Sequence, residues 1–232
     1  MVDGQPVVEA VAAALEPFDM AYGPDGRWDR WRIDGWLPVR AGCEDDPRVL
    51  RVSEPREGWV PDRCDGAPRG LLDFTLVRSA ARERAEAVWA EWYEIARRCP
   101  AGRPLGDFLL RHRADPEGYS LDAARLDHRS QPVMQAYIAA HDIGPGVIWF
   151  ESNDPIGLFG YEPEPYVGNR VARVVPASEL LRLDGVWVEY GDYPNSGNRF
   201  DHTSWDAYYR AADAYLDALP GDAYVVQIHI HS

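Results

Sequence analysis

Two segments of the chain repeat apolar residues at the three- and four-residue steps that place them on one side of an α-helix. In residues 72–98 this stripe consists of Val77, Ala81, Ala85, Val88, Trp92 and Ile95, and Cys99 continues it directly after the segment. In residues 205–219 it consists of Trp205, Tyr208, Tyr209, Ala212, Tyr215, Leu216 and Leu219. Asp73 lies at the start of the first segment as a candidate N-cap, and Pro220 follows the second segment as a stop signal. The pattern predicts two amphipathic helices, with shorter helices at 7–15, 105–111, 121–126, 131–140 and 166–173.

The end of the chain alternates with the two-residue period of a β-strand. One face carries Tyr224, Val226, Ile228 and Ile230, and the other carries Val225, Gln227, His229 and His231. Upstream, Asp184-Gly185 lies between two strand-like runs and predicts a hairpin closed by a two-residue type I′ turn. Further short strands are predicted at 28–33, 37–39, 49–52 and 147–150.

These elements predict an α+β fold with a mainly antiparallel sheet. We expect a C-terminal unit of hairpin, helix and strand to pack against the long amphipathic helix at 72–98. A length of 232 residues suits a single domain over 1–232. The alternative is a division near 100–130 into parts 1–100 and 131–232.

Composition places the chain among globular proteins, because 46% of its residues are hydrophobic and 12% are aromatic. No apolar run approaches the roughly 20 residues of a membrane span, and no secretory leader pattern is seen, so we expect a soluble cytoplasmic protein. Cys43, Cys64 and Cys99 form no C-x-x-C pair, which argues against a zinc knuckle or a disulfide framework. The net charge of −14 argues against binding to a nucleic-acid backbone.

All 24 residues counted as Lys and Arg are arginine. Lysine forms the Schiff base with pyridoxal phosphate and binds phosphate groups in a P-loop. The lysine-free sequence therefore excludes a pyridoxal phosphate site and a P-loop nucleotide site of the usual kind. Among cofactors, a divalent metal ion is the one for which the sequence offers candidate ligands.

The two histidines of the last strand are the strongest candidates for chemistry. His229 and His231 are two residues apart on one strand face, a spacing that lets two imidazoles bind one metal ion. The polar loop before the last helix offers Asp201 to orient a histidine and His202 as a third ligand or general base. These four catalytic candidates predict a small enzyme, a metal-assisted hydrolase that activates water. The alternative for the pair is an edge strand whose polar residues face water.

Two further hypotheses, neither of which involves catalysis, are alternatives to the enzyme hypothesis. Nine tryptophans, twelve tyrosines and an acidic C-terminal part fit a protein-binding or inhibitory module whose partner carries a basic surface. A small-molecule sensor is the other hypothesis. Trp28, Arg30 and Arg32 alternate onto one strand face, where they would stack on and bind an anionic ligand. Arg199 lies in the polar loop with Asp201 and His202 and is a ligand-binding candidate beside the histidine pair. No membrane partner is expected.

A family resemblance is carried by several short pieces of the chain: Cys64-Asp65-Gly66 with Pro68-Arg69, Leu71-Leu72-Asp73, Gln131-Pro132, Asp184-Gly185 before Trp187, and residues 214–220. Together they resemble a family of proteins of unknown function from actinobacteria and their phages. In that family an acidic residue stands two places before the terminal histidine, whereas here Gln227 precedes His229 at that distance. The resemblance implies an origin and no chemistry, and this departure weakens a carboxylate–imidazole interpretation.

Overall fold

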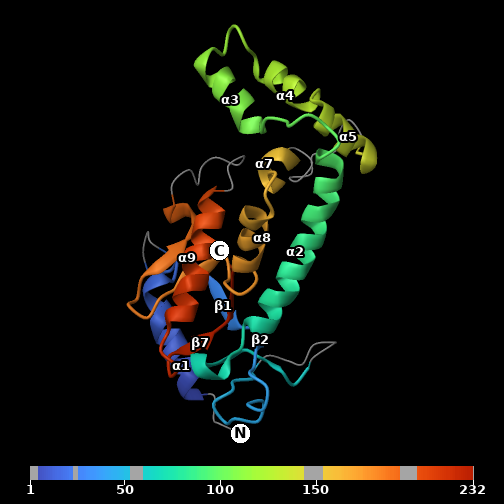
Figure 1. The fold of residues 1–232 in the computed structure, drawn as a ribbon. Helices are drawn as coiled ribbons and strands as arrows, with labels where there is room; N and C mark the ends of the chain where they lie inside the picture. Colours follow the sequence, from blue (N-terminus) through green and yellow to red (C-terminus); the bar gives the residue numbers. More distant parts are fainter. Residues whose placement is uncertain (1–4, 23–25, 53–59, 144–153, 194–202, 232) are drawn as a thin grey trace. The chain divides into compact units, whose positions relative to one another are not determined.

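The computed structural model describes residues 5–22, 26–52, 60–143, 154–193 and 203–231 (Figure 1). The chain forms two compact units. Unit 1 consists of Met1–Val77, Val175–Tyr190 and Tyr209–Ser232, and unit 2 consists of Arg78–Val174 and Gly191–Tyr208. Helices occur together with antiparallel strand pairs, which confirms the predicted α+β class. In the described part of the chain no helix has the length and apolar character needed to cross a membrane.

The helices follow the periodic segments of the sequence. They are α1 (Gln5–Leu15), α2 (Thr75–Ala96), α3 (Leu105–Ala114), α4 (Leu121–Arg129), α5 (Pro132–Ala140), α7 (Pro155–Phe159), α8 (Pro163–Ala172) and α9 (Thr203–Ala218). The two long amphipathic segments become α2 and α9, as predicted. The Asp73 carboxylate accepts the backbone N–H of Thr75 at 2.9 Å, so it binds one of the amides left free at the start of α2.

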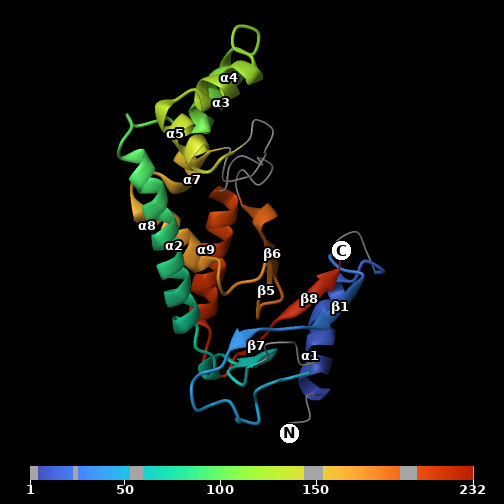
Figure 2. The same ribbon diagram turned by 90° about the vertical axis from the view of Figure 1, so that its right-hand side faces the viewer.

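Within the described residues the strands form four two-stranded antiparallel ladders. They pair β1 (Arg30–Ile33) with β8 (Ile228–His231), β2 (Leu37–Pro38) with β3 (Arg63–Cys64), β4 (Gly66–Pro68) with β7 (Tyr224–Val226), and β5 (Glu179–Leu181) with β6 (Trp187–Glu189). Figure 2 shows β1 and β8 side by side. The antiparallel pairing is as predicted, but the hairpin β5–β6 and the end of the chain belong to separate ladders.

Gln227 divides the predicted last strand in two. Its backbone N–H donates to the carbonyl oxygen of Asp65 at 2.9 Å, and its carbonyl oxygen accepts the N–H of Asp34 at 3.2 Å. Its side-chain Oε1 accepts the backbone N–H of Trp36 at 2.9 Å. Because these bonds lead to two different parts of the chain, the strand changes its partner at Gln227, from β4 to β1.

The hairpin at Asp184-Gly185 forms, but its turn is one residue longer than predicted. Gly185 has a φ of 78°, whereas Asp184 is not among the residues with positive φ. Arg182 donates its N–H to the carbonyl of Val186 at 3.0 Å, so the loop comprises residues 183–185. A type I′ turn needs two residues with positive φ, and here glycine alone adopts that conformation, as in a three-residue hairpin loop.

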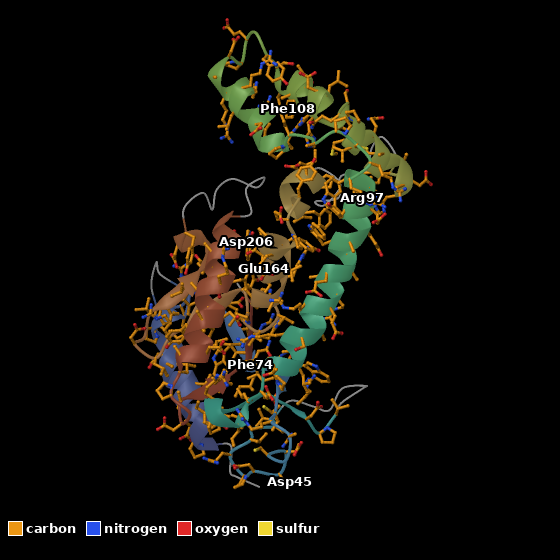
Figure 3. The ribbon with its side chains drawn as sticks, in the orientation of Figure 1. Asp45, Phe74, Arg97, Phe108, Glu164 and Asp206 are labelled. Carbon is orange, nitrogen blue, oxygen red and sulfur yellow. The ribbon has the colours of Figure 1, made fainter. Side chains whose placement is uncertain are left out.

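The core of unit 1 collects apolar residues from most of its elements. Its buried members are Leu37, Val39, Cys64, Ala67, Leu72, Phe74 and Leu216; Phe74 lies directly before α2 (Figure 3). The fully buried Asp65 lies beside this cluster, and its carboxylate accepts the backbone N–H groups of Gly35 at 2.8 Å and Val52 at 2.7 Å. The polar group therefore serves as an acceptor for backbone amides that the short strands leave unpaired.

The core of unit 2 is aromatic. Trp92 of α2 packs against Tyr137, Phe159 and Tyr161, with ring centroids 5.7, 5.7 and 6.5 Å away. The indole nitrogen of Trp92 donates to the carbonyl of Gly160 at 2.7 Å, so the buried polar atom of this ring is satisfied. Trp92 is thus a core residue of unit 2, and Trp89 packs against the same core.

Candidate functional site

The structure places the two C-terminal histidines on the solvent side of β8. His229 and His231 are exposed, while Ile228 and Ile230 on the opposite face are partly buried. His231 Nδ1 lies 2.9 Å from Asp29 Oδ1, and 58% of the His231 side chain is accessible to solvent. The two imidazoles therefore share a face, as the alternation predicts, and that face lies against solvent.

The other parts of the predicted histidine site fall outside the described residues. These are Arg199, Asp201 and His202. Among the residues that the structure does describe, no group of three or more His, Cys, Asp and Glu side chains could hold a metal ion. The metal-assisted hydrolase therefore stays a prediction.

The predicted stacking and anion-binding edge is divided between core and surface. Trp28 is 8% exposed and its indole nitrogen donates to the carbonyl of Leu15 at 3.2 Å, so this ring belongs to the core. Arg30 and Arg32 are exposed on β1. In the β1–β8 register they stand opposite His231 and His229, respectively. The structure thus brings the two arginines together with the histidines and not with Trp28.

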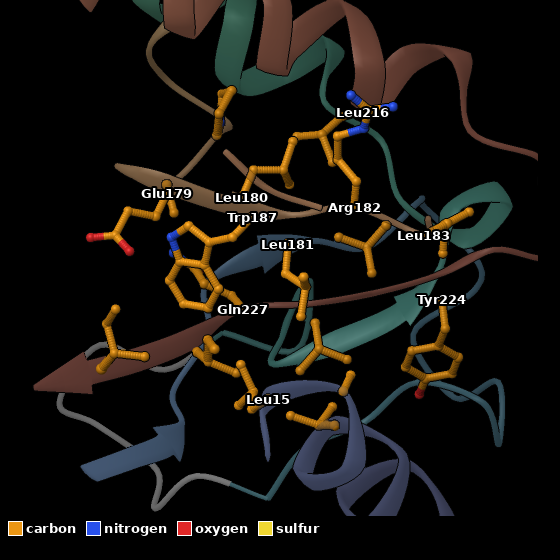
Figure 4. A pocket seen from close by; sticks show the side chains of 18 of the residues that line it. Leu15, Glu179, Leu180, Leu181, Arg182, Leu183, Trp187, Leu216, Tyr224 and Gln227 are labelled. Carbon is orange, nitrogen blue, oxygen red and sulfur yellow. The ribbon is translucent and has the colours of Figure 1, made fainter. Parts of the chain in front are cut away.

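A pocket of about 490 Å³ lies within unit 1, on the side of β8 that faces away from the histidines. Three segments form most of its wall (Figure 4): α1, residues 175–187 with the β5–β6 hairpin, and residues 224–230 in β7 and β8. In α1 and β8, the apolar side chains that reach the pocket follow the repeat of a helix and of a strand, respectively. Val7, Val11 and Ala14 recur at helical steps, and Ile228 and Ile230 alternate along the strand. The result is a concave, mainly apolar site.

Three of the polar side chains in the pocket wall already have protein partners. Tyr224 donates its hydroxyl to the carbonyl of Arg48 at 2.6 Å, and burial raises the pKa of Tyr224 to about 12. Gln227 accepts the N–H of Trp36 as described above. Arg182 forms an ion pair with Asp184. These groups shape the wall without leaving an unbalanced charge.

Glu179 and Trp187 define one end of the pocket (Figure 4). Glu179 stands directly opposite Glu189 in the β5–β6 register, and Arg27 Nη1 binds Glu189 Oε1 at 2.8 Å. Burial and, second, the charge of Glu189 raise the pKa of Glu179, while the Trp187 indole and Arg27 oppose that rise. A carboxylate is therefore held in a partly desolvated place beside a second carboxylate.

The Trp187 indole presents its nitrogen toward Glu179 in Figure 4. Its Nε1 is buried and has no partner within hydrogen-bonding geometry. An indole N–H directed at a carboxylate favours its charged form, so Trp187 acts to lower the pKa of Glu179 against the effect of burial. The ring of Trp187 also contacts Phe18 with a centroid distance of 5.0 Å, which helps to hold it at this end of the pocket.

Sequence reasoning identified the pieces of this pocket as a helix, a hairpin and a strand, but not as a site. The recurrence of Val7, Val11 and Ala14 marks an apolar helix face, which is the only local signal for it. Comparison with protein-family models, curated proteins and solved structures found no match to this chain. The functional argument therefore depends on the geometry of the site.

Proposed function

We propose that unit 1 is a non-catalytic binding module that takes one small apolar molecule into the pocket between α1, the β5–β6 hairpin and β8. The observation that carries this proposal is the pocket itself. Its volume of about 490 Å³ falls within the range of roughly 300–1,000 Å³ typical of small-molecule sites. Its wall is mainly aliphatic, with few polar groups.

The energetic argument is that an apolar wall open to water is costly unless something covers it. Transfer of apolar surface out of water contributes about 25 cal/mol per Å². The strand wall of the pocket is fixed to other parts of unit 1, because Gln227 and Tyr224 are held by hydrogen bonds to Trp36 and Arg48. A ligand would therefore gain hydrophobic burial against a wall that is already in place, which favours binding.

The test is a titration with N-phenyl-1-naphthylamine, an uncharged probe whose fluorescence rises in apolar surroundings. We expect saturable binding of one probe per chain. Ala14 lines the pocket and is exposed on α1, so Ala14→Trp should fill the site without burying a polar group and should weaken probe binding at least about tenfold.

The matched control is Ala12→Trp, because Ala12 is exposed on the same helix but does not line the pocket. It should bind the probe like the unaltered protein, and circular dichroism should show the same helix content for both variants. Absence of saturable binding to the unaltered protein, or an equal loss in both variants, would contradict the proposal.

A further inference from the structure

Around the pocket, two of the negatively charged side chains form ion pairs with arginines, but the carboxylate of Glu179 forms none with any residue that the structure describes. Arg182 is paired with Asp184, and Arg27 is paired with Glu189. Among the described residues no arginine or histidine forms an ion pair with Glu179, which lines the pocket at its Trp187 end. One carboxylate charge at that end is thus available to a ligand.

The aromatic ring beside this carboxylate further limits the kind of ligand group that would bind at this end of the pocket. Trp187 lines the same end of the pocket as Glu179 (Figure 4). The face of an indole attracts a cation through its quadrupole, and tryptophan is the strongest of the aromatic side chains in this respect. A carboxylate with an indole ring beside it is a combination that suits an ammonium group, because the carboxylate supplies the charge and the ring a second attractive surface for a cation.

We propose that the ligand of this pocket is an apolar amine, whose ammonium group binds Glu179 beside the Trp187 ring while its hydrocarbon part lies along α1 and β8. This inference rests on the proposed function of the pocket. The aliphatic residues Val7, Val11, Ile228 and Ile230 supply the surface for the hydrocarbon part.

Ligands of other charge fit this end of the pocket less well. A carboxylate would meet Glu179 and Glu189, which face each other across the hairpin, and the chain as a whole carries a net charge of −14. A neutral alcohol can donate a hydrogen bond to Glu179 but leaves the carboxylate charge uncompensated. Discrimination by charge should therefore follow the order amine, alcohol, carboxylate.

The experiment compares three probes that share one hydrocarbon chain: octylamine, octan-1-ol and octanoate. Each is used to displace N-phenyl-1-naphthylamine from the full chain at neutral pH, where octylamine is protonated. We expect octylamine to displace the probe at about tenfold lower concentration than octan-1-ol, since the Glu179 site is half-buried and its ion pair is partly screened. Octanoate should be the weakest competitor.

Two variants assign the preference to a residue. Glu179→Gln keeps the size of the side chain and should make octylamine and octan-1-ol equal competitors, with the affinity for octan-1-ol unchanged. Asp45→Asn removes the same charge from an exposed position outside the pocket (Figure 3) and should keep the tenfold preference. This control separates a local ion pair from the overall charge of the chain.

The outcomes distinguish the two proposals. If the probe itself does not bind, the proposed function fails and the amine inference fails with it. If the probe binds but octan-1-ol or octanoate competes as well as octylamine, the pocket stands as a binding site and the amine inference is wrong. A preference for octylamine that persists in Glu179→Gln would also overturn the inference.

Discussion

Replacement of Asp65 by alanine should be among the most destabilising single changes in unit 1. The Asp65 side chain is completely buried. Its Oδ1 accepts the N–H of Gly35 at 2.8 Å, and its Oδ2 accepts the N–H of Val52 at 2.7 Å. Its backbone also pairs with Leu50 and Gln227, so the residue binds three other stretches of unit 1: the one at Gly35, the one at 50–52 and the one at Gln227.

The magnitude follows from the two amides that lose their acceptor. The bond to Gly35 is buried, and a buried donor without a partner costs about 1–3 kcal/mol. The bond to Val52 is only partly buried, so water can replace much of it, and its loss should cost about 0.5–1 kcal/mol. With a small cavity added, Asp65→Ala should lower the free energy of unfolding by about 2–4 kcal/mol.

Urea denaturation followed by tryptophan fluorescence measures this loss. Asp65→Asn is the graded variant, because it keeps one acceptor oxygen and places an NH₂ group where the other oxygen was. It should fall between Asp65→Ala and the unaltered protein. Asp45→Asn, at an exposed site, should change the free energy of unfolding by less than about 0.5 kcal/mol. A loss below about 1 kcal/mol for Asp65→Ala would refute the view that this carboxylate organises unit 1.

Three further predictions concern the same unit. Gly35→Ala should cost about 1–3 kcal/mol in urea denaturation, because its Cβ would lie 2.5 Å from the Cα of Asp65; a stability equal to the unaltered protein would contradict this. Burial raises the pKa of Cys64 to about 11, so this thiol should react with a disulfide reagent at neutral pH only after unfolding, and mass spectrometry of the labelled peptides would reveal an earlier reaction. Octylamine binding should weaken as the pH falls through the raised pKa of Glu179, sooner than for an ordinary glutamate. Glu189, Arg27 and the Trp187 indole face this group, and octan-1-ol binding should stay constant in the same titration.

Local periodicity was sufficient to predict the helices and strands that have long repeating patterns. The stripes that include Trp92 and Tyr208 produced α2 and α9, because a helix face repeats every three to four residues over many turns. The alternation of residues 224–231 likewise predicted that His229 and His231 share a face. The five-residue helix α7 was not predicted, since a single turn is too short for periodicity; Asp154, which accepts the N–H of Gly157 at 2.9 Å, is its main local signal.

The sequence by itself determined which residues share a face, and the tertiary structure decided what each face meets. A two-residue turn would have paired Leu180 with Glu189, whereas the three-residue loop places Glu179 opposite that glutamate and at the end of the pocket. A shift of one residue moves every side chain of a strand to the other face, so a small difference in turn geometry decides which side chains line the pocket.

The face of β8 that lines the pocket carries the isoleucines and not the histidines, and α1, which lies some 200 positions away in the chain, forms the facing wall. Contacts over such a separation leave no local pattern, because any amphipathic helix could have covered the strand.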